Sequence, residues 1–147
     1  MPAYPDLSIP IRAALLNSGA VMGDMPSYKG ADNVYTRRPA PPDAPFPMII
    51  VSPDINTNDR GGLNDQRLSI MREVAVYAKN NTPESYRLCE SISRAVRDVF
   101  HRQRTSIAVT GWHVMNIWAV GPRAIPSEDD MDVGRSVLLT IDLIAAL

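Results

Sequence analysis

The feature that most constrains this chain is a dense run of prolines near its centre. Residues 39–47 contain five prolines, at positions 39, 41, 42, 45 and 47. Each proline fixes φ and removes a backbone donor, so the run forms neither a helix nor a central strand. Apolar residues 48–51 follow the run directly and are typical of a buried strand. We therefore predict a stiff, polyproline-like connector that leads into this strand, in preference to a disordered linker.

Length and composition predict one globular domain spanning residues 1–147. The chain is 45% hydrophobic and 21% charged, which is enough to close a core. Its formal net charge is −1, so no global field attracts nucleic acid or an anionic membrane. The single cysteine, Cys89, cannot form an internal disulfide, and no cluster of Cys and His offers four zinc ligands.

The sequence also argues against a membrane location. The longest apolar stretch, residues 143–147, is far shorter than the ~20 residues that span a bilayer. The first six residues lack a basic region and an apolar region, so we expect no secretory signal and synthesis in a reducing cytoplasm.

Before the connector, the pattern predicts one helix, a loop and a short strand. Ser8 is expected to cap the helix and Gly19 to end it. Apolar residues recur at helical spacing between them. Residues 19–33 are interpreted as a loop, and residues 34–37 as a brief strand.

After the connector, we predict a long strand and the second helix. Residues 54–66 are polar and contain glycine, which indicates a flexible loop. Residues 68–79 alternate, with Arg72 interrupting the apolar face. The helix is expected to begin with Thr82 as its cap and Pro83 in its first turn, and to end near Gln103. Its apolar stripe comprises Cys89, Ile92, Ala95, Val96, Val99 and Phe100, and its outer face offers the pairs Glu90–Arg94 and Asp98–Arg102.

Three β segments complete the chain, at residues 107–109, 112–120 and 133–144. Strict alternation in the second segment places Trp112, Val114, Trp118 and Val120 on one face. The third segment places Val137, Leu139, Ile141 and Leu143 on one face. The order α-β-β-β-α-β-β-β and the short connections predict an α+β fold, a mostly antiparallel sheet covered by two helices.

Few titratable side chains in this sequence form a pattern that suggests catalysis. His101 is interpreted as a structural residue at a helix end, and His113 as an exposed residue opposite the two tryptophans. Cys89 is expected to be a buried, inert thiol. The acidic residues 128–132 lack the ligand spacing of an EF-hand loop, and Gly61-Gly62 lacks the motif of a phosphate loop. We predict no catalytic residues, no cofactor and no metal site, and hence no enzyme.

Loops and sheet edges instead favour a component of an assembly. A sheet must protect its edges, and sharing them with a neighbouring subunit is one way to do so. The polar loop and an arginine pair supply the candidate interface residues, which are Asn56, Asn58, Asp59, Arg60, Leu63, Asp65, Arg37 and Arg38.

A family resemblance sharpens this interpretation. It involves the helix at residues 11–16, the strand residues Val34-Tyr35 and, most specifically, the stretch at residues 43–47 that leads into the apolar strand. In order and spacing the chain resembles the tail-terminator or tail-completion family of long-tailed bacteriophages and gene transfer agents. It departs from the family at Met48, where an aromatic residue is common, and in its longer acidic segment at residues 121–132.

The resemblance implies a ring-forming structural virion protein of the tail or neck, assembled in the host bacterial cytoplasm. A homo-hexamer would cap the tail tube protein, end polymerisation and join a head-completion or stopper protein. DNA would pass through the ring without sequence-specific binding, which fits the low net charge. The family carries no catalytic residues and no cofactor. A head-completion or stopper protein of the neck is the alternative, and a small-ligand-binding or enzymatic α+β domain is the second alternative.

Overall fold

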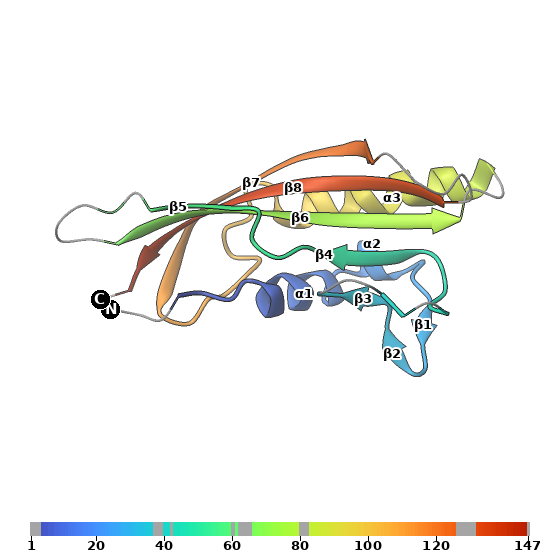
Figure 1. Cartoon of the computed structure of the whole chain (residues 1–147), viewed down its shortest axis with the longest axis horizontal. Coiled ribbons are helices and arrows are strands. Elements are labelled where there is room, and N and C mark those ends of the chain that lie inside the picture. Colours follow the sequence, from blue (N-terminus) through green and yellow to red (C-terminus); the bar gives the residue numbers. More distant parts are fainter. Residues whose placement is uncertain are drawn as a thin grey trace.

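The computed structural model describes residues 4–36, 40–41, 43–59, 61, 66–79, 83–125 and 132–146. It confirms an α+β fold in which most strands are antiparallel (Figure 1). The elements are α1 (Ser8–Leu16), α2 (Gly19–Met22), β1 (Ser27–Tyr28), β2 (Ala31–Asp32), β3 (Val34–Tyr35), β4 (Met48–Val51), β5 (Asn56–Asp59), β6 (Arg67–Lys79), α3 (Pro83–Phe100), β7 (Trp112–Ile125) and β8 (Asp132–Ala145).

The main sheet is built around the two long strands β6 and β8. Its order is β3-β4-β6-β8-β7, and β5 pairs with β6 beyond the end of β4. The β6–β8 ladder is antiparallel and runs without a break from Arg67↔Ile144 to Lys79↔Asp132. Only β3 and β4 pair in parallel among the described strands, and β1 and β2 form a separate two-stranded sheet. Strands β3 and β7 therefore occupy opposite edges of the main sheet.

The principal core lies between one face of this sheet and the three helices. The predicted stripe of α3 and the predicted inward faces of β6 and β8 are confirmed. The fully or nearly fully buried side chains of this core include Leu7, Ile11, Leu15, Val21, Ile49, Val51, Ile70, Val74, Val76, Cys89, Ile92, Val96, Phe100, Ile117, Val137, Leu139, Ile141 and Leu143. Burial of this continuous apolar layer is the main source of stability. No helix within the described residues is long and apolar enough to cross a membrane.

A second, smaller apolar cluster lies on the other face of the sheet. Met48 and Ile50 point to this face from β4, and Ala44 of the proline connector covers them. Tyr28, Tyr35 and Phe46 pack around this cluster and are only partly buried. The connector therefore covers one end of the face that the helices leave free. Pro39 and Pro42 lie outside the described residues.

Among the described residues, Arg72 is the one charged side chain that is buried between the main sheet and the helices. Its side chain is 5% exposed, and Nε donates to Asp54 Oδ1 at 2.6 Å. A second nitrogen donates to Ser8 Oγ at 2.6 Å and to the Ser52 carbonyl at 2.9 Å. Asp6 lies 3.7 Å away. Arg72 therefore joins β6 to the start of α1 and to the link between β4 and β5.

The amino-terminal predictions need correction. Ser8 does not cap α1, because Leu7 occupies the N-cap without a side-chain bond and the Asp6 carboxylate accepts from Ser8 N. This bond from Ser8 is the main reason that the pKa of Asp6 is lowered. Gly19 does not end α1 but begins α2, which Ser18 caps through a bond from Val21 N. The predicted loop at residues 19–33 thus contains α2, β1 and β2.

Further element boundaries and one ion pair differ from prediction. Residues 56–59 form β5 and pair with β6, where a loop was expected. Residues 107–109 form no strand, and Val109 makes only an isolated bridge to Trp112. Helix α3 ends at Phe100, because Arg102 takes a positive φ of 58°. The pair Glu90–Arg94 is confirmed at 3.4 Å, whereas Asp98 lies 3.8 Å from Arg97 instead of pairing with Arg102. Pro83 begins α3 as predicted, and Thr82 lies outside the described residues.

We predict that Arg72→Met lowers the free energy of unfolding by about 3 kcal/mol, because it leaves the Asp54 carboxylate and two serine oxygens without their buried donor. Urea unfolding followed by circular dichroism measures this loss. Arg94→Met is the matched control, since that side chain is 69% exposed and its ion pair contributes about 0.5 kcal/mol or less. Equal losses in the two variants would contradict a structural role for the Arg72 network.

We predict that Phe46→Ala costs about 1–2 kcal/mol, less than the full cost of a core phenylalanine, because the Phe46 ring is only partly buried. Phe100→Ala is the comparison, since Phe100 is fully buried in the principal core and its loss should cost about 3–5 kcal/mol. The urea midpoints of the two variants show which substitution lowers the stability more. A larger loss from Phe46→Ala would mean that the connector is the dominant anchor of the fold.

Candidate assembly surfaces

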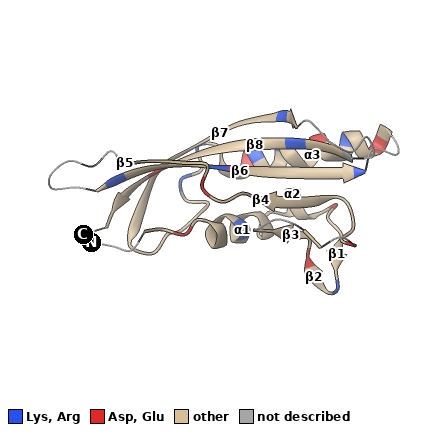
Figure 2. Cartoon of the chain, in the orientation of Figure 1, with Lys and Arg blue, Asp and Glu red and all other residues tan. Residues whose placement is uncertain are grey.

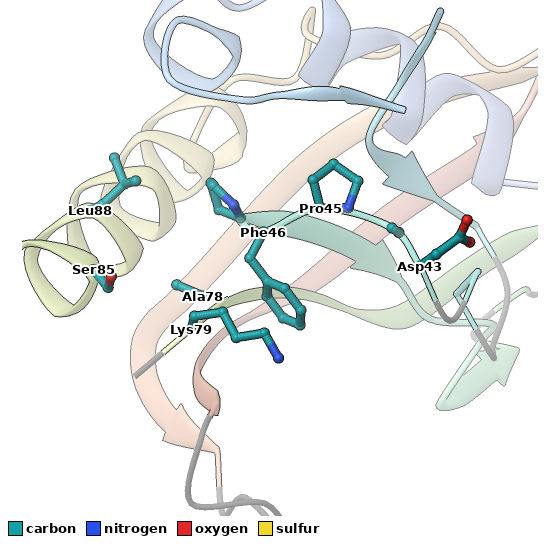
Figure 3. Close-up of a pocket in the computed structure, with 9 residues that line it drawn as sticks. Asp43, Pro45, Phe46, Ala78, Lys79, Ser85 and Leu88 are labelled. Carbon is teal, nitrogen blue, oxygen red and sulfur yellow. The ribbon is translucent and has the colours of Figure 1, made fainter. Parts of the chain in front are cut away.

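The hollow beside the proline connector does not bring its two charged side chains together. The hollow beside the proline connector has a volume of about 460 Å³ and lies between the connector, the end of β6 and α3. Lys79 Nζ lies 4.5 Å from the centre of the Phe46 ring, and Asp43 lies on the other side of that ring (Figure 3). These two charged groups do not point toward each other (Figure 3). Within the described residues, no three His, Cys, Asp or Glu side chains are close enough to hold a metal ion.

Cys89 lies in the principal core, as predicted. The side chain is fully buried, and Sγ donates to the Val76 carbonyl at 3.4 Å. Burial, the main cause, raises the pKa of the thiol to about 11. At neutral pH the sulfur is therefore a protonated, enclosed group rather than a nucleophile.

His101 has a structural role at the end of α3, as predicted. Its Nδ1 accepts a hydrogen bond from Ala119 N at 3.1 Å. The next residue, Arg102, donates its backbone N–H to the Ile117 carbonyl at 2.8 Å. These two bonds satisfy the Ala119 N–H and the Ile117 carbonyl on the free edge of β7, as another strand would at that point. At the opposite edge, Arg12 Nε donates to the Val34 carbonyl at 3.1 Å.

A β-bulge in β7 overturns the predicted face of Trp118. The pairing shifts between Val114↔Leu143 and Asn116↔Asp142, so Met115 is an extra residue. Trp112 remains in the core, but beyond the bulge the inward positions belong to Ile117 and Ala119. Trp118 and Val120 consequently face outward, and the shared face predicted for the two tryptophans is wrong. Bulges commonly redirect side chains in this way.

The bulge creates an apolar patch on the face that the helices leave uncovered. Met115, Trp118 and Val120 are 54%, 42% and 50% exposed. The His101 ring meets Trp118 edge-on at 4.6 Å, and the Arg102 guanidinium lies 5.2 Å from the Trp118 ring centre. We call these five residues the Trp118 patch. Tryptophan and arginine are the side chains most enriched at the energetic centres of protein interfaces, so this patch is suited to a protein partner.

The predicted interface residues are only partly described. Asn56, Asn58 and Asp59 lie on β5 and are exposed. Arg60, Leu63, Asp65, Arg37 and Arg38 lie outside the described residues. Strand β5 and the start of β6 form an arm that extends away from the helices (Figure 1). Tyr4 supports the base of this arm through bonds to Asp54 at 3.0 Å and to Thr57 Oγ1 at 2.7 Å.

Sequence reasoning missed the Trp118 patch, although one signal was available. Ile117 and Ala119 are apolar but out of phase with Trp112 and Val114. A strand whose apolar residues follow two different alternation patterns either exposes the residues of one pattern or changes from one pattern to the other at a β-bulge. His113 was correctly predicted to be exposed.

The fold is found in a solved virus-like particle. A chain from a structure described as the virion of a native gene transfer agent (GTA) particle is similar with a TM-score of 0.72. The two sequences are 13% identical, and the alignment covers 95% of each chain. At this identity the likeness establishes a shared fold over nearly the whole chain. No family model matches the sequence, and no curated protein matches it.

We predict that Cys89 resists iodoacetamide at pH 8 in the folded protein, because a pKa of about 11 leaves about one thiol in a thousand ionised and burial blocks access. Mass spectrometry should detect alkylation only after unfolding in guanidinium chloride. Ser91→Cys, at an exposed position of α3, is the control and should label in the folded state. Rapid labelling of Cys89 in the folded protein would contradict the inert thiol.

Proposed function

We propose that this chain is a non-enzymatic structural protein of a phage-like particle that acts as its tail terminator. In this role a homo-hexameric ring caps the tail tube, ends its polymerisation and forms the surface that joins the head through a head-completion or stopper protein. DNA passes through the ring without sequence-specific binding. The observation that carries the proposal is the shared fold, over 95% of both chains, with a chain of a gene transfer agent virion.

Physical features of the chain support a role in assembly. The helices cover only one face of the main sheet, and the proline connector covers only one end of the other face. The rest of that face carries the exposed Met115, Trp118 and Val120. Apolar exposure of this kind, at the edge of a sheet, is typical of a surface that a partner covers. In a closed ring of identical subunits, each subunit covers such a surface of its neighbour through one contact that is repeated around the ring.

The sequence stretch that carries the family resemblance has a defined structural role. The connector delivers the chain into β4, whose four residues are all buried. Strand β4 lies between β3 and β6 inside the sheet. The proline run therefore belongs to the architecture of the fold, which supports its use as a family signature.

We predict that particles made without this protein have tails of uncontrolled length and free heads, because nothing ends growth of the tube or joins it to the head. Electron microscopy of such particles measures tail length and head attachment. Supplying the wild-type chain should restore tails of uniform length with a ring at the head-proximal end.

A second complementation separates the roles of the ring and the arm. A variant in which a short Asn-Gly turn replaces residues 61–66 keeps the register of β5 and β6 and should fold with nearly unchanged stability, since loop closure depends weakly on length. If the arm contacts the tail tube, this variant should fail to restore uniform tails. Normal tails with detached heads in the absence of the protein would instead favour the head-completion or stopper role.

A further inference from the structure

Strand β5 has few interactions of its own that hold it in the sheet. Its four residues are all polar, and asparagine and aspartate are depleted in strands. Three of the four are exposed, and only Thr57 is half-buried. Among the described strands, β5 pairs with β6 alone. The position of β5 therefore depends on its backbone bonds to β6 and on contacts from outside the arm.

The contact from outside the arm comes from Tyr4, in the segment before α1. The Tyr4 hydroxyl lies 3.0 Å from Asp54 Oδ2 and 2.7 Å from Thr57 Oγ1. A phenol has one hydroxyl hydrogen and an ionised carboxylate only accepts, so Tyr4 donates to Asp54 and Thr57 donates to Tyr4. Thr57 pairs with the buried Ile70, so its side chain lies on the face of the sheet toward the helices. The Tyr4 hydroxyl thus joins β5 to the link between β4 and β5.

Asp54 is a fixed anchor for this hydroxyl. Its other oxygen, Oδ1, accepts from Arg72 Nε at 2.6 Å, and the Asp54 side chain is only 22% exposed. Acidic residues lie both in this link and in the segment before α1 (Figure 2), where Asp6 is 3.7 Å from Arg72. The Arg72 network therefore holds the Asp54 carboxylate in place whether or not Tyr4 is bound to it.

Tyr4 itself is held weakly. The residue is 58% exposed, so little buried apolar area fixes its ring and water competes for both hydroxyl bonds. Hydrogen bonds at such a site contribute modestly to stability, and they can break without disturbing the core. Tyr4 thus combines a firmly held acceptor with a contact that opens easily.

Opening of β5 exposes one side of β6. The Met71 carbonyl accepts a hydrogen bond from Ile55 N at 2.8 Å, so the backbone groups of Met71 face β5. Backbone groups alternate in direction along a strand, so those of Ser69 also face β5, and those of Ile70 face β8. While β5 is in place, it closes the edge of β6 beyond the end of β4.

We propose that the Tyr4 hydroxyl is a latch that keeps β5 on β6, and that its release lets β5 open while the rest of the main sheet stays intact. The latch makes the closure of this sheet edge depend on the segment before α1, which is 53 residues away from Thr57 in the sequence. The inference goes beyond the proposed function and does not rest on it, because it concerns the isolated chain.

Amide hydrogen exchange of the full chain, resolved by NMR, tests the latch. In the wild type, the amides of Ile55 and Ser69 should exchange through one shared local opening, and the amide of Ile70, which faces β8, should exchange more slowly. Tyr4→Phe removes only the hydroxyl. It should speed exchange at Ile55 and Ser69 about tenfold, because opening of β5 no longer breaks the two hydroxyl bonds.

Substitutions of Thr57 show whether its bond to Tyr4 is responsible. Thr57→Val keeps the branched shape and the strand propensity but removes the hydroxyl, and it should speed exchange at the same two amides. Thr57→Ser keeps the hydroxyl and should stay closer to the wild type than Thr57→Val does. A chain with both Tyr4→Phe and Thr57→Val should exchange no faster than Tyr4→Phe alone, because the two changes remove the same bond.

Tyr86→Phe is the matched control, because it removes a hydroxyl from a tyrosine of α3 that is 47% exposed. Exchange at Ile55 and Ser69 should stay unchanged in this variant, and circular dichroism melts establish that every variant is folded. Three outcomes overturn the latch: unchanged exchange in Tyr4→Phe, equal acceleration in Tyr86→Phe, or wild-type exchange in Thr57→Val. The terminator role is judged separately on particles, so it stands or falls independently of these results.

Discussion

The long antiparallel ladder between β6 and β8 is the constraint on which the rest of the structure depends. Its register is continuous from Arg67↔Ile144 to Lys79↔Asp132, and one apolar side of each strand faces the helices, through residues such as Val74 of β6 and Leu139 of β8. Because side chains alternate with a period of two, this register determines which face of the sheet is buried. Strands β4 and β5 then pair along one side of β6, and β7 pairs along the free side of β8.

This one-sided arrangement leaves part of the main sheet exposed. Helices α1, α2 and α3 contribute to a single core, and the connector shields the other face only around Met48 and Ile50. The two sheet edges are closed locally, by Arg12 at β3 and by His101 and Arg102 at β7. Hydrogen bonds of this kind at a sheet edge hinder non-specific strand pairing at those positions.

Much of the fold could be predicted from residue patterns because those patterns have local physical causes. Pro83 and the apolar stripe of α3 predict a helix, and both are confirmed. The run of apolar residues in β4 predicts a buried strand, and all four are buried. The alternation in β6 and β8 predicts their inward faces correctly, and even the interruption at Arg72 is real, since Arg72 points inward and pairs with Asp54.

The features that sequence reasoning missed depend on groups that are distant in the chain. The polar residues of β5 form a strand because the start of β6 offers them backbone partners, not because of their own propensity. Ser8 Oγ accepts a hydrogen bond from Arg72, which lies 64 residues away in the sequence. The Ser8 N–H donates to the Asp6 carboxylate. Phe46, which lies just before the apolar run of β4, packs only at the margin of the smaller cluster.

By itself, the sequence determined the class of fold, the long helix, the faces of β6 and β8 and the inert Cys89. Each of these follows from local backbone restriction or from an uninterrupted periodicity. The connector was predicted to be extended, but it contains a turn in which Ala44 N donates to the Pro41 carbonyl at 3.0 Å. Only the tertiary structure decided the outward face of Trp118, its contacts with His101 and Arg102, and the closure of the sheet edges. A bulge at Met115 reverses the side chains of β7 from Asn116 to Val120, and a second register shift follows between Val120 and Arg123. Pairing with β8 decides where these irregularities lie.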